Sequence, residues 1–321
     1  MNKFDLGDLL AEPKDNHDLW FRTEMTHRQF ASLALKMKNV DIENEILNLD
    51  FFRNGIKQAK NLNLKEVEKW LLNSWNTEKV LVHNRSTIEN TGQSFAMQWA
   101  FPQAYYSVFG NLLAHYKSIG YTQQSHNAVL KKFSDLMKEN KFPLGISFYC
   151  SGGLKNIEFV NILKPNDLIA IEFDINISET IDNQICQFLK STREIKLTEK
   201  AIDMKLKNKP GEKRRNLNRE KWNIVSKAIG GTTILDLLYR KRIKANYQDI
   251  ETFSSVHFKG LDVLNDLCAI VNRLNLVNET FTTKAIGIEI YKEILQRYLL
   301  KESNFAVEDR FDTIKSIIHA V

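Results

Sequence analysis

The chain of 321 residues is poor in residues that interrupt helices or cross-link segments. It contains 13 glycines and 5 prolines, and so low a content of helix breakers favours a mainly helical protein. The three cysteines, Cys150, Cys186 and Cys268, are odd in number and widely spaced, which argues against a disulfide framework and against a zinc site. We therefore expect reduced cysteines and a cytoplasmic protein.

Long apolar runs and common catalytic motifs are also missing. No run of eighteen apolar residues occurs, and the N-terminal residues lack the apolar segment of a secretion signal, so we expect no membrane contact. The chain has no Gly-Lys-Ser/Thr phosphate loop, no His-Glu-x-x-His, no Gly-x-Ser-x-Gly and no dinucleotide fingerprint. We accordingly predict no metal and no cofactor.

The positive charge is concentrated in one segment. The chain has a net charge of +6, yet residues 190–221 alone contain twelve Lys and Arg against five Asp and Glu. Within this segment, Lys213, Arg214, Arg215 and Arg219 precede a tryptophan, a pattern that can hold backbone phosphates and stack a base. The alternative is a solvated charged surface, which is the usual role of a charge run.

Apolar residues recur at helical spacing over most of the first half. The pattern predicts helices within 41–81 and a polar loop at 84–92. It also predicts a helix with one continuous apolar face over 105–119, which begins near Pro102 and ends at a glycine. Ser125 is expected to cap the helix that follows.

The pattern changes after residue 143. Short β-branched and aromatic runs at 145–150, 157–163 and 168–173 predict three strands of a small sheet. A helix is expected from Ser178, then an exposed loop at 207–218. Further helices are predicted from 232 onward, with a long one at 254–274 and two more at 286–299 and 309–319.

Two stretches of this pattern resemble the two halves of a HEPN domain, a helical bundle of prokaryotic toxins, defence proteins and nucleotidyltransferase partners. The first runs from the Ala-Tyr-Tyr at 104–106 to the Ser-His at 125–126 and the helix that follows. The second is 239–247, in which Arg242 precedes an Asn-Tyr pair. The chain lacks the Gly-Ser carboxylate signature of a nucleotidyltransferase, so it would at most be the partner of such an enzyme.

The resemblance implies a mainly α fold, a HEPN-like bundle with a small α+β insertion. The bundle would comprise residues 93–140 and 231–321. An N-terminal helical region, 1–92, would precede it, and residues 141–230 would form the insertion with its basic loop.

The resemblance also implies a role for two residues of the second stretch. Ribonucleases of this family have an arginine, then four to six residues, then a histidine, and Tyr247 occupies the position of that histidine here. A tyrosine with an ordinary pKa of about 10 is a poor base at neutral pH. The resemblance therefore implies that Arg242 contacts a phosphate and Tyr247 positions a sugar or base, and it leaves metal-independent endoribonuclease activity open.

Three residues of the first stretch could support this site. Tyr105 and Tyr106 would face the bound RNA, or alternatively pack in the core; His126 would assist, or only bond its own turn. Arg242 shares a helix face with apolar residues, so it needs an anionic partner, either a bound phosphate or a structural carboxylate.

Two classes of function follow from these residues. The first is an RNA-binding protein of a prokaryotic defence or toxin–antitoxin system, with or without ribonuclease activity. The alternative is a non-catalytic interaction module that forms a homodimer, or binds a nucleotidyltransferase or another partner protein. The sequence leaves open the RNA target, the partner and the oligomeric state.

Overall fold

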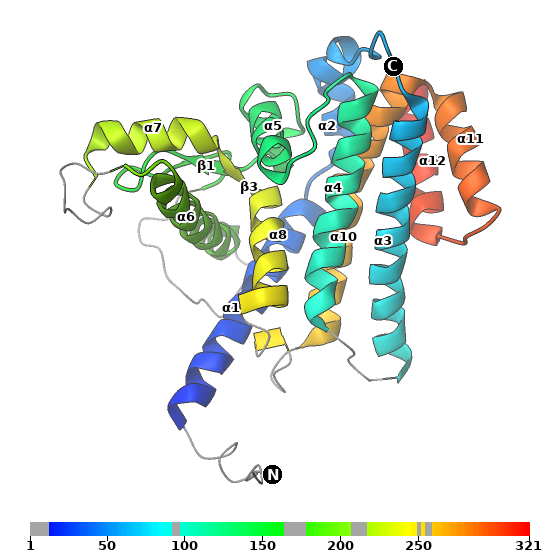
Figure 1. The fold of residues 1–321 in the computed structure, drawn as a ribbon. Helices are drawn as coiled ribbons and strands as arrows, with labels where there is room; N and C mark the ends of the chain where they lie inside the picture. Colours follow the sequence, from blue (N-terminus) through cyan, green and yellow to red (C-terminus); the bar gives the residue numbers. More distant parts are fainter. Residues whose placement is uncertain (1–12, 92–96, 164–177, 207–216, 249–251, 254–258) are drawn as a thin grey trace, which may run out of the picture.

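The computed structural model describes residues 13–91, 97–163, 178–206, 217–248, 252–253 and 259–321, and it is mainly helical with a small antiparallel sheet (Figure 1). This confirms the predicted mainly α class with a small α+β part, whereas the HEPN-like character of the bundle stays a prediction. The elements up to residue 138 are α1 (Pro13–Lys38), α2 (Ile42–Asn48), the π-helical turn η1 (Phe51–Gly55), α3 (Leu64–Thr91), the 3-10 turn η2 (Met97–Trp99), α4 (Ala100–Ser118) and α5 (His126–Lys138).

The second half contains the sheet and a further set of helices. Its elements are the 3-10 turn η3 (Leu144–Ile146), β1 (Tyr149–Ser151), β2 (Glu158–Val160), α6 (Ser178–Asp203), α7 (Arg219–Ile229), β3 (Thr232–Thr233), α8 (Ile234–Ile243), the π-helical turn η5 (Lys244–Gln248), α10 (Gly260–Ile286), α11 (Ile288–Leu299) and α12 (Phe305–His319). None of the helices in the described ranges is long and apolar enough to span a membrane.

Helix α4 is the centre of the bundle. It packs along α3 and α10 and also contacts α8, as Figure 1 shows. Buried residues lie on almost every face of α4, so the apolar face predicted from the sequence is only part of its contact surface. At Gly110 the helices α3 and α4 approach closely, because a Cβ there would lie 3.2 Å from the Cβ of Ser74.

The predicted ends of α4 and α5 are confirmed. Pro102 lies in the first turn of α4, and Gly120 follows the C-cap residue Ile119 with a φ of +88°, a conformation that favours glycine. The Ser125 hydroxyl accepts a hydrogen bond from the backbone amide of Ala128 at 3.4 Å, so Ser125 caps α5.

Two helices are longer than predicted. The polar residues at 84–91 continue α3 instead of forming a loop, because Ile88 is buried against the core. Helix α10 continues from 274 to 286, although its sequence there is rich in Asn, Glu and Thr. These polar side chains are buried and bonded inside the bundle, so a polar sequence here does not mark an exposed loop.

The sheet has the strand order β2-β1-β3. Strand β1 pairs antiparallel with both neighbours, with Cys150 opposite Phe159 and Thr232. The third strand is therefore at 232–233, where the sequence pattern predicted the start of a helix. The predicted strand at 168–173 lies outside the described residues.

Arg193 of α6 holds the sheet region together. Its side chain is fully buried and donates to the carbonyl of Gly152 through Nε (2.8 Å) and Nη2 (2.6 Å). It also donates through Nη1 to the carbonyl of Gly230 at 2.9 Å. This cation of the basic segment is thus structural and cannot meet a phosphate from solvent.

One hydrophobic core joins buried residues from Phe30 to Ile317, including Phe148 and Phe188 from the predicted insertion. A second, small cluster between α6 and α7 contains Leu197, Ala201, Leu217, Trp222 and Val225. The division of the chain at residues 92, 140 and 230 stays a prediction.

Candidate functional site

Helices α4 and α8 place Arg242 against three tyrosine rings. The guanidinium carbon lies 4.9 Å from the ring centre of Tyr106, 5.3 Å from that of Tyr239 and 5.7 Å from that of Tyr105. Tyr239 precedes Arg242 by three residues, so both side chains are on one face of α8. These four residues and His126 are termed the arginine–tyrosine cluster below.

His126, the first residue of α5, completes the cluster. Its Nδ1 lies 2.8 Å from the hydroxyl of Tyr105, and its ring contacts those of Phe109 and Tyr239. Burial lowers the pKa of His126, and the Arg242 cation lowers it further, so the imidazole is neutral at pH 7. Burial also raises the pKa of Tyr105 well above its ordinary value, so its phenol stays protonated.

Arg242 has no anionic partner in the part of the chain that the structure describes. Its buried Nε makes no hydrogen bond there, and the contacts of the guanidinium are with aromatic rings. A ring quadrupole stabilises a cation but does not neutralise it. Because the side chain is only half-buried, the charge is open to a ligand from solvent. The sequence left two partners open for Arg242, a bound phosphate or a structural carboxylate. No carboxylate of the described residues pairs with it.

Arg242 ends a run of three basic residues, 240–242, and each of the three side chains contacts a different part of the molecule. Arg240 donates to the hydroxyls of Ser191 and Thr192 on α6, and Lys241 donates to the hydroxyl of Thr26 on α1. Consecutive helical residues are about 100° apart around the axis, so a run in the sequence is not one surface stripe. Arg242 is the member that faces the cluster.

Two exposed aromatic residues lie near the cluster. Tyr247, in η5 directly after α8, is 73% exposed, and Trp99, in η2 directly before α4, is 54% exposed. The turns η2 and η5 pack against each other. Tyr247 is thus exposed in the turn after α8 and is not one of the rings against Arg242. The sequence analysis missed Trp99, whose only signal was its place before the predicted helix.

The structure describes only one of the four basic residues that the sequence predicted to hold backbone phosphates. Lys213, Arg214 and Arg215 lie outside the described residues. Arg219 is exposed in the first turn of α7. The expectation that Trp222 stacks on a base is wrong, because its ring is buried in the small core between α6 and α7.

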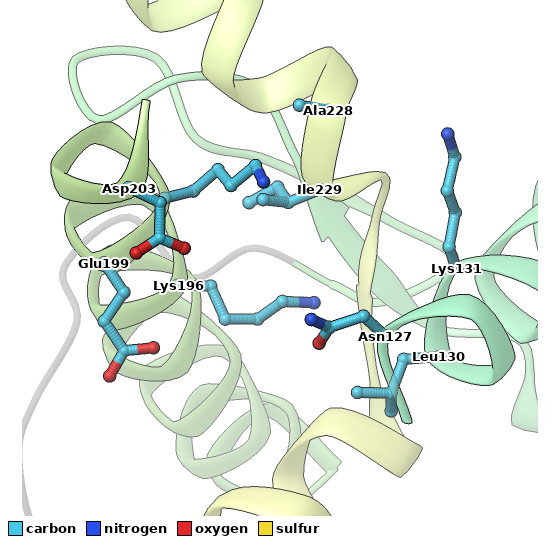
Figure 2. Close-up of a pocket in the computed structure, with 9 residues that line it drawn as sticks. Asn127, Leu130, Lys131, Lys196, Glu199, Asp203, Ala228 and Ile229 are labelled. Atoms are coloured by element: carbon cyan, nitrogen blue, oxygen red, sulfur yellow. The ribbon is translucent and has the colours of Figure 1, made fainter. Parts of the chain in front are cut away.

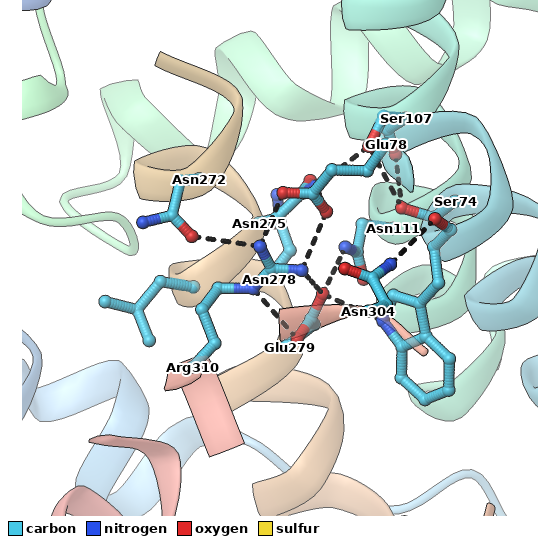
Figure 3. Close-up of polar contacts among 12 residues, drawn as sticks. Ser74, Glu78, Ser107, Asn111, Asn272, Asn275, Asn278, Glu279, Asn304 and Arg310 are labelled. Carbon is cyan, nitrogen blue, oxygen red and sulfur yellow. Dashed lines mark hydrogen bonds and ion pairs between the residues drawn. The ribbon is translucent and has the colours of Figure 1, made fainter. Parts of the chain in front are cut away.

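A second arginine, Arg310, forms a buried polar centre that the sequence analysis did not detect (Figure 3). It donates to both oxygens of Glu78 at 2.6 and 2.8 Å and to Glu279 at 2.8 Å. Trp75 and Tyr291 also donate to Glu279. All three charged side chains are at most 3% exposed, so this centre lies inside the fold and offers no surface to a ligand.

The remaining observations concern metals and known proteins. Among the residues that the structure describes, no group of three or more His, Cys, Asp or Glu side chains is placed to hold a metal ion. Comparisons of the chain with protein-family models, with curated proteins and with solved structures give no match.

Proposed function

We propose that this chain is a HEPN-like RNA-binding protein in which the arginine–tyrosine cluster holds one phosphate of a single-stranded RNA. The observation that carries the proposal is the half-buried Arg242, which has no anionic partner within the described residues. A guanidinium presents a fork of donors that fits phosphate oxygens. The resemblance, which adds a role in a prokaryotic defence or toxin–antitoxin system, assigns phosphate contact to the same residue.

The exposed aromatic residues supply base contacts in this proposal. Tyr247 and Trp99 each offer a ring face to solvent next to the cluster. Stacking of a base on such a ring is worth about 1–3 kcal/mol and tolerates any base. The proposed ligand is therefore an unpaired strand of low sequence specificity, because the bases of a duplex are already stacked on each other.

Cleavage of the RNA is a second candidate function, and the position of His126 favours it. Its neutral imidazole can accept the proton of a 2′-hydroxyl, a step for which Tyr247 is poorly suited. The 2′-oxygen would then attack phosphorus while Arg242 stabilises the charge on the phosphoryl oxygens. The bond to the 5′-oxygen breaks, that oxygen takes a proton from water, and the imidazolium of His126 returns its proton to solvent. The products would be a 2′,3′-cyclic phosphate and a 5′-hydroxyl.

Binding of end-labelled single-stranded RNA by the wild-type protein and by Arg242→Ala tests the proposal. The matched control is Arg297→Ala, which removes one positive charge from an exposed pair with Glu68. A hydrogen bond to a charged group contributes about 1.5–3 kcal/mol, so we expect Arg242→Ala to weaken binding about 10- to 100-fold. The control should retain nearly full affinity.

Three results would redirect the assignment. Equal binding by Arg242→Ala and the wild type would contradict the proposal. A concentration-dependent mass without RNA affinity would favour the protein-interaction module, and equal binding of DNA of the same sequence would remove RNA as the preferred ligand. Cyclic-phosphate products that are lost in His126→Gln would establish the cleavage function.

A further inference from the structure

The contact between Tyr105 and His126 decides which nitrogen of the imidazole carries the proton. The hydroxyl oxygen of Tyr105 and Nδ1 of His126 are 2.8 Å apart, so one of the two groups donates to the other. A neutral imidazole has one nitrogen that donates and one that accepts, whereas a phenol can do both. The contact therefore allows two arrangements, and they give His126 opposite roles towards a ligand.

The burial of Tyr105 selects between the two arrangements. The residue is fully buried, and its hydroxyl has no second hydrogen-bond partner among the described residues. Burial raises the pKa of Tyr105, so the phenol keeps its proton at neutral pH. If Nδ1 of His126 were the donor, the buried O–H of Tyr105 would have no acceptor, which is costly inside a protein. Tyr105 therefore donates, and Nδ1 accepts.

The proton of the imidazole is then on Nε2, on the side of the ring away from Tyr105. His126 is only half-buried. Its Nε2 makes no hydrogen bond within the described residues and is not enclosed by them. The Nε2–H group is therefore a neutral donor that a ligand can reach.

His126 and Arg242 have the same two tyrosine rings as neighbours. The ring centre of Tyr106 lies 4.9 Å from the guanidinium carbon of Arg242 and 6.1 Å from the ring centre of His126. For Tyr239 the two distances are 5.3 and 5.4 Å. Burial lowers the pKa of His126 and the charge of Arg242 lowers it further, as expected for groups this close. One ligand can therefore meet both donors.

The cluster differs in its charge from the cavity of about 150 Å³ between α5, α6 and α7 (Figure 2). That cavity is lined by lysines but also by two carboxylates, Glu199 and Asp203. Its Lys196 pairs in addition with the buried Asp236. In the arginine–tyrosine cluster, by contrast, Arg242 has no carboxylate partner within the described residues, and the imidazole adds a second donor. A ligand of the cluster must supply acceptors, as phosphate oxygens do.

We infer that the Tyr105 hydroxyl fixes His126 in the tautomer with the proton on Nε2, so that His126 donates to the phosphate that Arg242 holds. This inference rests on the proposed function. Tyr105 is a positioning residue in it, because it acts on the ligand through His126. Transfer of a 2′-hydroxyl proton to Nε2 would need the other tautomer, which leaves the O–H of Tyr105 without an acceptor. The inference therefore favours binding over cleavage at this cluster.

Nitrogen-15 NMR of the histidine rings tests the tautomer in the ligand-free protein. At pH 8 the imidazole of His126 is neutral, and protonated and unprotonated ring nitrogens give well-separated signals. The signals of His126 are those that disappear in His126→Gln. Tyr105→Phe removes the hydroxyl and keeps the ring. The matched control is Tyr116→Phe on the same helix, because the buried hydroxyl of Tyr116 has no hydrogen-bond partner in the described structure.

The wild type and Tyr116→Phe should show a single tautomer of His126, with the proton on Nε2. In Tyr105→Phe the Nδ1 signal should shift, and the two tautomers should be mixed. A proton on Nδ1 in the wild type would overturn the inference, and so would identical His126 signals in the wild type and a folded Tyr105→Phe. These spectra contain no RNA, so their failure would leave the proposed function untouched.

Binding of end-labelled single-stranded RNA then tests the donor role of His126. The amide of His126→Gln carries N–H donors near the position of Nε2, whereas His126→Leu has no donor. We expect His126→Leu to bind about tenfold more weakly than the wild type, which corresponds to about 1.4 kcal/mol, and His126→Gln to keep most of the affinity.

The same assay separates the inference from the proposed function. Equal affinities of His126→Leu and His126→Gln would overturn the inference, whereas weaker binding by Arg242→Ala would still support the proposed function. If Arg242→Ala binds RNA like the wild type, the proposed function fails, and the phosphate contact of His126 fails with it.

Discussion

Two arginines of the same helical bundle, Arg310 and Arg242, have opposite environments. Arg310 is 3% exposed and pairs with two buried carboxylates, Glu78 and Glu279 (Figure 3). Arg242 is half-buried, lies over tyrosine rings and has no anionic partner in the described part of the chain. The buried centre is complete without a ligand, whereas the charge of Arg242 still lacks a counterion.

Two histidines of the same region extend the comparison. His115, on α4, is fully buried against Phe281, and neither ring nitrogen has a hydrogen-bond partner in the described structure. His126 is half-buried beside Arg242 and contacts the hydroxyl of Tyr105. The comparison indicates that the interior of the bundle shuts its polar residues off from solvent, while the end formed by α4, α5 and α8 retains groups that a ligand could use.

The largest expected effect is on the buried centre. Arg310→Ala leaves Glu78 and Glu279 without their cation, and breaking a buried ion pair in this way costs about 3–5 kcal/mol. We expect a lower midpoint of urea unfolding, monitored by circular dichroism. The control Arg297→Ala breaks an exposed pair and should cost no more than about 1 kcal/mol. Equal midpoints for both variants would show that the buried centre is not stabilising.

Acidification should lower the free energy of unfolding through the buried His115. Burial lowers the pKa of His115 to about 3 from its ordinary value of 6.5. Between these two values the unfolded chain binds a proton that the folded chain excludes, so the free energy of unfolding falls as the pH decreases below 6.5. Each pH unit contributes about 1.4 kcal/mol, which amounts to about 2 kcal/mol at pH 5.

The measurement is the unfolding midpoint of the wild type and of His115→Phe at pH 7 and at pH 5. His115→Phe keeps an aromatic ring without a titratable group, so it should lose less stability on acidification. If both proteins lose the same amount of stability between pH 7 and pH 5, the imidazole of His115 is not the group that resists protonation.

Arg242→Ala should lower the affinity for RNA with little effect on stability, whereas Arg310→Ala should mainly lower stability. Loss of partly exposed cation–π contacts costs about 0.5–1 kcal/mol, so we expect little change in the midpoint of urea unfolding. The same variant should lose most of its RNA affinity, as proposed above. A strong destabilisation by Arg242→Ala would place this residue with Arg310 as a structural arginine and would remove the contrast between the two regions.

The smallest expected effect concerns His126. Its lowered pKa keeps the imidazole neutral at pH 7, and protonation on acidification adds a positive charge beside Arg242. The affinity for RNA should therefore rise modestly as the pH falls from 7 to 5, and His126→Gln should show less of this rise. An identical pH dependence of binding in both proteins would separate His126 from the phosphate site.

Local patterns predicted some elements well and failed where burial was decided by distant contacts. The apolar spacing of α4, the glycine after it and the cap at Ser125 were all predictable, because each depends on residues within a few positions. The extensions of α3 and α10 were not, because they depend on burial against other helices, as for Ile88 of α3, and on hydrogen bonds across the bundle, as for Asn275 of α10. Glu78 and Asn275, for example, are hydrogen-bonded although they are 197 residues apart.

The candidate site shows the same division. The resemblance selected Arg242, Tyr105, Tyr106 and His126, and the structure places these four side chains together. It did not indicate the ring of Tyr239 as a contact or the exposure of Trp99. The cations of the basic segment also end in different environments. Arg193 is buried, where it links strands and turns, while other cations remain at the surface.

The sequence by itself determined the helical class, the course of α4 and α5 and the uneven charge, because these follow from composition and from the spacing of neighbouring residues. Only the tertiary structure decided which arginine is paired. Arg310 and its partner Glu78 are 232 residues apart, and Arg242 meets Tyr106 from another helix. Pairing of a charge depends on what the fold brings within a few ångströms, and no local pattern contains that information.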